Sequence, residues 1–309
     1  MNEKQAPQEL CPICNCKNIA NYLKSKDYRL KKKVGGNIEI HLRRCNECEH
    51  IWQFPYPNEV DIPGFYDEEF YNNNKNYLNR LLNNFQYSRL KRLIEKFFNN
   101  KMIRLLDFGA GQGQLMRYLI DNGYEVHGTE ISKSGIDIGE KVFGLRIIGD
   151  PLNYLNKANT SYDLVIASHV IEHLVDPYKY MVLINKLIKK GGCIALEVPN
   201  INSWESKIFR DKYIHLDVPR HIHHFSNKSL SILLKKTGFH CQDSSGIYTL
   251  QFPLSGIQSI VNYLKFKNKY NFLILMSMIL IAPFYLILSI LINAFHPEKI
   301  CIGGIYSKV

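Results

Sequence analysis

The chain has 309 residues, enough for about two domains, and a formal net charge of +11. Its composition, with 46% hydrophobic and 22% charged residues, is typical of a globular protein. Basic and aromatic residues do not alternate as they do on nucleic-acid-binding surfaces, so we predict no nucleic-acid partner.

The first residues of the chain carry no targeting signal that we recognise. Residues 1–10 are polar and no apolar run follows them, so we expect no signal peptide. The eight cysteines form no secretory disulfide framework, which points to a reducing compartment. We therefore expect a cytoplasmic protein.

Two Cys-x-x-Cys pairs stand near the start of the chain, Cys11 with Cys14 and Cys45 with Cys48. Four thiolates with this spacing satisfy a tetrahedral zinc ion. A site with four protein ligands leaves no open coordination position, so we predict structural and not catalytic zinc. Three nearby side chains are alternative ligands: Cys16, His41 and His50.

The segment between the cysteine pairs contains Val34-Gly-Gly-Asn37, which predicts a hairpin turn flanked by strands. Residues 1–60 are thus expected to form a zinc ribbon. Residues 61–100 are expected to be a helical linker or cap, because residues 72–100 are rich in Asn and then carry apolar side chains at helical spacing. That apolar face is predicted to contain Leu81, Phe85, Leu90, Leu93, Ile94 and Phe97.

Residues 102–115 have the pattern of a buried strand, a glycine turn and the start of a helix, with which α/β folds build cofactor sites. Asp107 stands at the end of the strand. A turn that binds pyrophosphate favours Gly or Ala where this chain has Gln114, and an acid at position 107 would repel phosphate but could hold an ammonium group. These two residues argue against a nicotinamide-dependent oxidoreductase. The turn contains three glycines, Gly109, Gly111 and Gly113.

Four more strand-like runs follow, and an acid ends each of the first two. Residues 124–130 end in Glu130, and residues 145–150 end in Asp150. The other two runs are residues 161–168 and 192–199, and helical segments lie between the runs. This alternation predicts a parallel, doubly wound sheet within residues 101–250.

Asp107 with its glycine turn, followed in register by Glu130 and Asp150, resembles motif I and the later acids of the class I S-adenosylmethionine-dependent methyltransferases. The resemblance implies an α/β fold with a doubly wound Rossmann-like sheet, S-adenosylmethionine as the cofactor and methyl transfer as the reaction. It also implies that Glu130 holds the ribose hydroxyls and that Asp150 meets the adenine amino group. The implied cofactor-binding residues are Asp107, Gly109, Gly111, Gly113, Glu130, Asp150, Ser168 and His169.

Residues 48–57 and 65–71 extend the resemblance to a bacterial subgroup with an amino-terminal zinc-binding module, several of whose members modify sugars. In this fold the helix expected within residues 72–100 usually covers the mouth of the cofactor site. The run Pro219-Arg-His221 and the run His224-Phe-Ser226 are similar to the stretch before the last helix in this subgroup. That stretch lies over the substrate side of the cofactor pocket.

Methyl transfer to a hydroxyl or carbon needs a base, and a histidine suits this role near neutral pH. His221 and His224 are the leading candidates, followed by His173 and then His169. Each of them could instead be a structural histidine or a donor that positions the substrate.

Residues 272–295 contain no charged side chain, and as one helix they would reach about 36 Å, enough to cross a bilayer core of about 30 Å. Residues 299–309, however, resemble the antiparallel final strand of this fold, which must return to the sheet. Pro283 offers a break into two short helices. We therefore favour an apolar helical insert over residues 251–298 that rests on the cytoplasmic membrane face, beside a basic collar of Lys265, Lys267 and Lys269.

Two other interpretations of the apolar segment stay open. One is a true membrane crossing, with the final strand assigned wrongly. The other is a helical pair buried against a second copy of the chain.

The first functional hypothesis is a methyltransferase that acts on a small molecule, a sugar or a lipid-linked glycan. Neither an Asn/Asp-Pro-Pro-Tyr/Phe run nor a cysteine stands directly after the run 161–168, which argues against methylation of nucleic-acid bases. The alternative is a zinc-ribbon binding protein with a non-catalytic methyltransferase fold.

Overall fold

The computed structural model describes residues 10–25, 39–66, 77–99, 103–158, 161–244 and 299–309, together with Ser259, Phe284, Ile287 and Leu291. The hairpin turn expected at residues 34–37 and most of the apolar segment 272–295 lie outside the described residues. Among the residues that are described, no helix is both long and apolar enough to cross a membrane.

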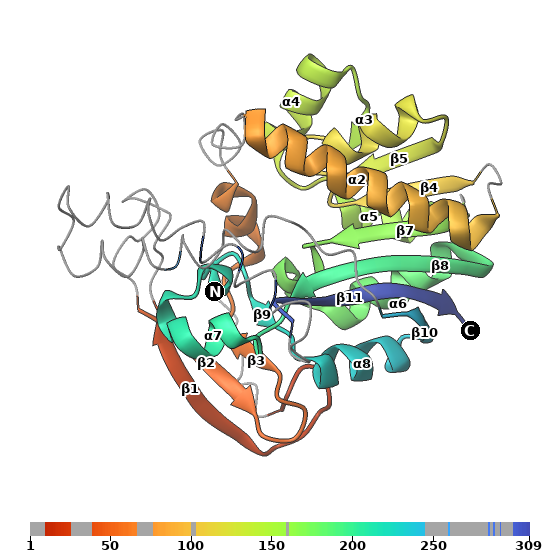
Figure 1. Cartoon of the computed structure of the whole chain (residues 1–309). Helices are drawn as coiled ribbons and strands as arrows, with labels where there is room; N and C mark the ends of the chain where they lie inside the picture. The colour runs from red at the N-terminus through yellow and green to blue at the C-terminus, as the bar shows by residue number, and fades with distance from the viewer. Residues whose placement is uncertain are drawn as a thin grey trace, which may run out of the picture.

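The amino-terminal part contains a small antiparallel sheet of the strands β1 (Ile19–Ser25), β2 (Ile40–Cys45) and β3 (Ile51–Gln53). A fourth strand, β9 (His223–His224), comes from far along the chain and pairs with β3. The short 3-10 helix η1 (Glu59–Phe65) follows β3. The cysteine-rich segment, residues 11–48, therefore shares its sheet with residues 221–226, which we call the histidine run (Figure 1).

The expected linker helix is α2 (Tyr77–Phe98). Leu90 and Ile94 are buried as predicted, but Phe85 is 51% exposed, so its assignment to the apolar face was wrong. Nine residues separate Phe85 from Ile94, and at about 100° per residue they point to opposite sides of the helix.

The central sheet has seven strands in the order β10-β11-β8-β7-β4-β5-β6. Neighbouring strands from β8 to β6 run parallel, whereas β11 is antiparallel to both β8 and β10. This confirms the doubly wound Rossmann-like fold class and the antiparallel final strand. The strands are β4 (Arg104–Phe108), β5 (Glu125–Thr129), β6 (Ile147–Ile148), β7 (Tyr162–Ser168), β8 (Ile188–Pro199), β10 (Phe239–Asp243) and β11 (Cys301–Lys308).

Helices cover both faces of this sheet. Side chains of α2, α3 and α4 pack in one apolar cluster, and those of α5, α6 and α8 pack in another. Along β4, Leu105 belongs to the first cluster and Leu106 to the second, as the alternation of strand side chains requires. The helices are α3 (Gln114–Asp121), α4 (Lys133–Phe143), α5 (Pro151–Lys157), α6 (Pro177–Leu187), α7 (Trp204–Phe209) and α8 (Asn227–Lys236), with the 3-10 helices η2 (Ile171–His173), η3 (Arg210–Lys212) and η4 (Ile214–Leu216).

Most helix starts follow from local capping. The hydroxyl of Ser132 accepts a hydrogen bond from the Gly135 amide, the Asp176 carboxylate accepts one from the Lys179 amide, and Ser226 forms a capping box with Ser229. The pair Gly191-Gly192 predicts the end of a helix over residues 177–190, but α6 already ends at Leu187. The glycines expected to end it instead lie in β8, where the pairing with β7 shifts register and needs extra residues.

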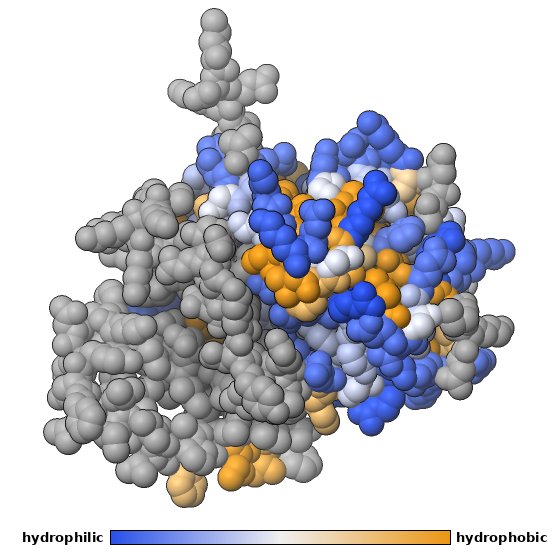
Figure 2. Space-filling model, turned by 90° about the horizontal axis from the view of Figure 1, so that it is seen from above, coloured by the Kyte–Doolittle hydropathy of each residue, from blue (hydrophilic) through white to orange (hydrophobic). Residues whose placement is uncertain are grey.

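The core of the molecule joins the cysteine-rich segment to the central sheet. Cys11, Cys45 and Cys48 belong to the same buried cluster as Phe225 and Leu196. Cys193, Cys241 and Cys301 fall in strand-like runs of the sequence, which predicts that they are buried. Cys193 and Cys301 are buried, whereas Cys241 is exposed because β10 is the edge strand and only its first residue is buried. The domain boundaries at residues 60, 100, 250 and 298 stay predictions. Seen from above, an apolar patch lies near the centre of the view among mostly hydrophilic residues, and further apolar residues lie at the lower edge (Figure 2).

Candidate functional site

The glycine turn after β4 has the backbone that the sequence predicts. Gly109, Gly111 and Gly113 have φ angles of 80°, 57° and 79°, a left-handed region that favours glycine. The amides of Gly109 and Ala110 donate to the carbonyl of Thr129, at 2.9 and 2.8 Å. The turn therefore lies across the end of β5, and Gly113 forms the N-cap of α3.

Asp107 is a buried acid with an unsatisfied oxygen. Its side chain is only 5% exposed, and Oδ2 has no hydrogen-bond partner. Burial, with a smaller contribution from the charge of Glu130, raises the pKa of Asp107 to about 7. A buried carboxylate of this kind is stabilised by a cation beside it, and the ammonium group of S-adenosylmethionine would supply one. The residues present at the turn thus fit the cofactor.

Glu130, at the end of β5, is buried and holds three backbone amides. Oε2 accepts from Gly111 at 2.8 Å, while Oε1 accepts from Ile131 at 2.9 Å and from Ser132 at 2.8 Å. The side chain therefore fixes the glycine turn against the start of α4. A carboxylate has about four acceptor positions, so it keeps room for a hydroxyl. Its contact with the ribose stays a prediction.

Asp150 follows the end of β6, and Ser168 is the last residue of β7. Asp150 is exposed, has a left-handed backbone, and its carboxylate accepts from the Asn153 amide at 3.1 Å to cap α5. Capping alone accounts for this acid, and the contact with adenine stays a prediction. Ser168 is half-buried at the end of β7.

The helix α2 contacts the start of α3, directly after the glycine turn, and its role as a cap over the cofactor site stays a prediction. The side-chain amide of Asn83 donates to Gln114 Oε1 at 2.9 Å, at the first residue of α3. Gln114 is the residue that distinguishes this turn from a pyrophosphate-binding one, and Asn83 is a hydrogen-bond partner of it on α2. Sequence patterns gave no signal for Asn83.

His169 follows β7 with a φ of 56° and lies between two buried glutamates. Its Nδ1 is 3.3 Å from Glu172 Oε1, and its Nε2 is 3.3 Å from Glu197 Oε1. Burial opposes the charged form, but the hydrogen bonds to both carboxylates outweigh it and raise the pKa of His169 to about 10. His169 is thus an imidazolium and not a base. Glu197, at the end of β8, was missed by the sequence analysis.

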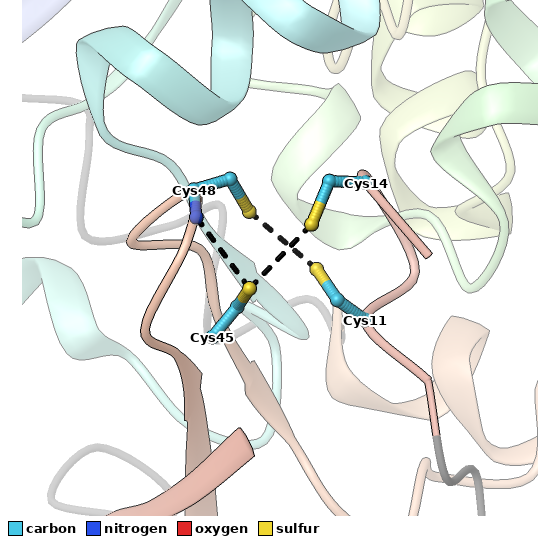
Figure 3. A group of neighbouring side chains, drawn as sticks. All are labelled: Cys11, Cys14, Cys45 and Cys48. Carbon is cyan, nitrogen blue, oxygen red and sulfur yellow. Dashed lines mark hydrogen bonds between the residues drawn. The ribbon is translucent and has the colours of Figure 1, made fainter. Parts of the chain in front are cut away.

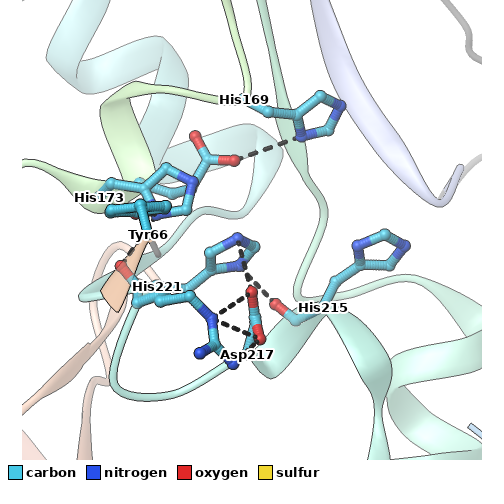
Figure 4. Close-up of polar contacts among 8 residues, drawn as sticks. Tyr66, His169, His173, His215, Asp217 and His221 are labelled. Carbon is cyan, nitrogen blue, oxygen red and sulfur yellow. Dashed lines mark hydrogen bonds and ion pairs between the residues drawn. The ribbon is translucent and has the colours of Figure 1, made fainter. Parts of the chain in front are cut away.

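His173 and His221 have their tautomers fixed by backbone carbonyls (Figure 4). Nδ1 of His173 lies 2.9 Å from the Arg220 carbonyl and 2.8 Å from the Tyr66 hydroxyl, and Nδ1 of His221 lies 2.7 Å from the His215 carbonyl. A carbonyl only accepts, so each Nδ1 carries the proton. Nε2 of a neutral ring then presents a lone pair.

The two rings lie edge to face, with centroids 4.5 Å apart, and nitrogen atoms of both approach the carboxylate of Glu172 within 4.8 Å. Burial, reinforced by the neighbouring His173, lowers the pKa of His221 well below its usual value, so the ring is neutral. Its Nε2 is 3.9 Å from Asp217 Oδ2. The structure therefore brings Glu172, His173 and His221 together.

His224 is buried in β9, and burial lowers its pKa to about 3. Its Nε2 has no hydrogen-bond partner, and its ring centroid is 6.4 Å from that of His221. Both line a small pocket between the end of β8 and β9. The pocket is lined by Pro199, Ile201, Tyr213, His215, His221, His223 and His224.

The four predicted cysteine ligands converge (Figure 3). The sulfur atoms of Cys11 and Cys48 are 3.5 Å apart, as are those of Cys14 and Cys45, and all four lie within 4.8 Å of one another. Sulfur atoms bound to one tetrahedral zinc ion are separated by about 3.8 Å. The alternative ligand Cys16 instead accepts a hydrogen bond from the Asn18 amide, and His50 bonds to His223.

The comparison with known protein families shows the family of this chain. A family described as "Methyltransferase domain" matches residues 82–244, more than half of the chain. This chain belongs to that methyltransferase family. The matched residues contain Asp107, the glycine turn and Glu130. They also contain the four candidate histidines, His169, His173, His221 and His224. The protein is a S-adenosylmethionine-dependent methyltransferase with a Rossmann-like fold.

Curated relatives of the methyltransferase agree with this class. It is 27% identical over 182 residues, 54% of this chain and 74% of the relative, to the ubiquinone biosynthesis O-methyltransferase of Ruegeria sp. strain TM1040. It is 27% identical over 176 residues, 52% of this chain and 71% of the relative, to the protein with the same name from Cereibacter sphaeroides strain KD131.

Solved structures also resemble the methyltransferase. A SAM-dependent methyltransferase from Archaeoglobus fulgidus is 21% identical, with a TM-score of 0.46, and the match covers 72% of this chain and 92% of that one. Magnesium protoporphyrin IX methyltransferase from Synechocystis PCC 6803 is 16% identical, with a TM-score of 0.43 and coverage of 56% and 84%.

Replacement of Asp107 by Asn is expected to weaken the binding of S-adenosylhomocysteine about tenfold or more, because it removes the charged partner of the ligand's ammonium group. In the wild type the carboxyl group must lose its proton to bind this cation. Affinity should therefore fall as the pH is lowered through about 7, and the variant should lose this dependence. Isothermal titration calorimetry between pH 5.5 and pH 8 measures both effects.

The matched control is Asp121→Asn, which alters an exposed carboxylate on α3 that pairs with Arg117. It should bind the ligand as the wild type does. Equal affinities of Asp107→Asn and wild type at pH 8 would show that Asp107 does not hold the ammonium group.

Proposed function

We propose that the methyltransferase methylates a hydroxyl group of a small molecule, a sugar or a lipid-linked glycan, with His221 as the general base. The observation that carries the proposal is the neutral, buried ring of His221, whose Nδ1–H is held by the His215 carbonyl and whose Nε2 is left to accept a proton. The names of the curated relatives, which are O-methyltransferases, support a hydroxyl acceptor.

The cofactor would be held by Asp107 at its ammonium group, by Glu130 at its ribose and by the glycine turn. Bound there, S-adenosylmethionine supplies an electrophilic methyl group. His221 Nε2 then accepts the proton of the acceptor hydroxyl, and the imidazolium that forms lies 3.9 Å from the Asp217 carboxylate, which stabilises its charge. Arg220, in an ion pair with Asp217 at 2.6 Å, holds that carboxylate in place.

His173 and His224 would position the acceptor. His173 Nε2 and the unpartnered Oε2 of Glu172 offer acceptors for further hydroxyl groups near the same point. His224 lines the pocket from β9. His169 stays charged between Glu172 and Glu197, and so it orients Glu172 and takes no proton.

Replacement of His221 by Gln is expected to lower the rate of methyl transfer by a factor of about 10² to 10⁴, the usual contribution of a general base. Labelled S-adenosylmethionine would be incubated with the protein and a cell extract, and the extract then separated into small-molecule, lipid, glycan and macromolecule fractions. We expect base-stable label in one of the first three.

His240→Gln, an exposed histidine on β10, is the control and should keep the wild-type rate. Label confined to protein or nucleic acid would contradict the acceptor class. A wild-type rate for His221→Gln would contradict its role as a base.

We propose further that Cys11, Cys14, Cys45 and Cys48 bind one structural zinc ion. The convergence of four sulfur atoms at nearly the spacing of a zinc-thiolate site supports this assignment.

Elemental analysis of the purified chain should find about one zinc ion per chain, and Cys48→Ser should reduce this content. Cys241→Ser changes an exposed cysteine outside the cluster and should leave it unchanged. Equal zinc content in Cys48→Ser and wild type would exclude the site.

We also propose that the apolar segment contacts the membrane peripherally. Its three described residues, Phe284, Ile287 and Leu291, are helical and 75%, 59% and 51% exposed. Their spacing places them on one side of a helix, and the lysines at positions 265, 267 and 269 precede the segment.

The full chain should sediment with vesicles that contain phosphatidylglycerol and less with pure phosphatidylcholine vesicles. Ile287→Glu should weaken the sedimentation about tenfold, because it would place a charge in the lipid interface. Val142→Glu, which places the same charge on the exposed side of α4, is the control and should leave the sedimentation unchanged. Equal sedimentation of Ile287→Glu and wild type would rule out contact through this face.

A further inference from the structure

We propose that the cysteine cluster positions the catalytic histidines, and that His50 is the positioning residue that connects the two. This inference rests on the proposed function, because it assumes that the cluster binds zinc and that His221 serves the reaction. It adds that loss of zinc displaces the histidine run while the cofactor-binding turn keeps its structure.

The backbone of the histidine run is held by the cysteine-rich segment. In the pairing of β3 with β9, Ile51 lies opposite His224 and Trp52 opposite His223. One residue before β9, the Ile222 carbonyl accepts from the Gln53 amide at 2.9 Å. The pairing therefore reaches the residue next to His221.

The turn from Cys45 to Cys48, which we call the knuckle, contacts the end of the histidine run. The hydroxyl of Ser226 donates to the carbonyl of Cys48 at 3.1 Å. Beside it, the side-chain amide of Asn202 donates to Glu49 Oε2 at 2.6 Å. A movement of the Cys45–Cys48 turn would therefore be passed directly to both segments that border the pocket of His221 and His224.

His50 connects the knuckle to β9 through two separate bonds. Its carbonyl accepts from the Cys45 amide at 2.9 Å, which closes the metal-binding turn. Its Nε2 is 2.9 Å from His223 Nδ1, and His223 Nε2 lies 3.2 Å from the Val175 carbonyl. Since the carbonyl only accepts, His223 donates through Nε2, and the proton between the two rings belongs to His50.

The His50 ring has no solvent exposure, so its orientation is set by packing and by this bond. It stacks on His223 with centroids 5.1 Å apart and contacts Phe225 at 4.9 Å. On the opposite side, the histidine run is bonded to η2, because the Ile222 amide donates to the Glu172 carbonyl at 2.8 Å. The run is thus held between the knuckle and the residues that carry Glu172 and His173.

The cofactor turn is held by other residues. The amides of Gly109 and Ala110 donate to Thr129, and Gly111 donates to Glu130. These bonds join the turn to β5 and to the start of α4, and no partner among them belongs to the described part of residues 1–60. Loss of the metal ion should therefore affect the acceptor side of the site and spare the cofactor side.

The test compares the zinc-loaded chain, the zinc-stripped chain and two variants of His50. His50→Gln keeps a side-chain N–H donor, whereas His50→Leu removes it. Imidazole nitrogen NMR signals of the full chain, labelled at histidine and assigned by single replacements, report the environment and tautomer of His221 and His224. Calorimetry with S-adenosylhomocysteine reports the cofactor side.

Zinc removal and His50→Leu should both shift the signals of His221 and His224, while the affinity for S-adenosylhomocysteine stays within about twofold of wild type. Incorporation of labelled methyl groups into the acceptor fraction should fall between about tenfold and a hundredfold, as for a displacement of about 1 Å at a catalytic group. His50→Gln should restore most of the signals and the rate. His240→Leu is the exposed-histidine control.

Unchanged His221 and His224 signals after zinc removal, or in His50→Leu, would overturn the proposal. So would loss of S-adenosylhomocysteine binding in either sample, because the cluster would then support the whole fold and not the histidine run alone. Failure of the wild type itself to bind S-adenosylhomocysteine would instead contradict the proposed function.

Discussion

Parallel strands end at the same edge of a sheet, and this constraint assembles the site of the methyltransferase. β4, β5, β7 and β8 deliver Asp107, Glu130, His169 and Glu197 to that edge, although the four residues are spread over ninety positions of the chain. None of these side chains could meet another through local sequence contacts. The glycine turn then bends the chain sharply enough for the Gly111 amide to reach Glu130, which fixes the turn at the same edge.

The cofactor side of this edge could be predicted from sequence because its signals are local. A buried strand, an acid and three glycines with left-handed backbones follow one another within residues 104–113, and the left-handed backbones favour glycine. The antiparallel final strand was likewise predicted correctly, and the four cysteines assigned to one site lie together, since strand pattern and Cys-x-x-Cys spacing are also local. That these cysteines bind zinc stays a prediction.

The acceptor side could not be predicted in the same way. Glu197 looks in the sequence like any polar residue inside a strand, and Tyr66 meets His173 from more than a hundred residues away. The pairing of β3 with β9 involves two residues of each strand, which is too short to leave a pattern. The resemblance implies that His169 binds the cofactor, which stays a prediction. Its ion pairs with Glu172 and Glu197 could not be predicted, because they depend on a fold that brings β8 beside β7. Phe85 and Cys241 were misplaced for a related reason, because burial depends on which neighbours a helix or an edge strand acquires.

The order of the strands in the sheet also has a consequence for synthesis of the chain. β11 lies between β8 and β10, yet it is made last of the three. During translation the edges of β8 and β10 that face β11 therefore stay unpaired until residues 301–308 leave the ribosome. β8 is long and mostly buried in the folded protein. A nascent chain with unpaired strand edges can associate with other chains through those edges. The yield of folded protein in a cell should therefore depend on how quickly β11 is synthesised and on chaperones that bind the unpaired edges before then.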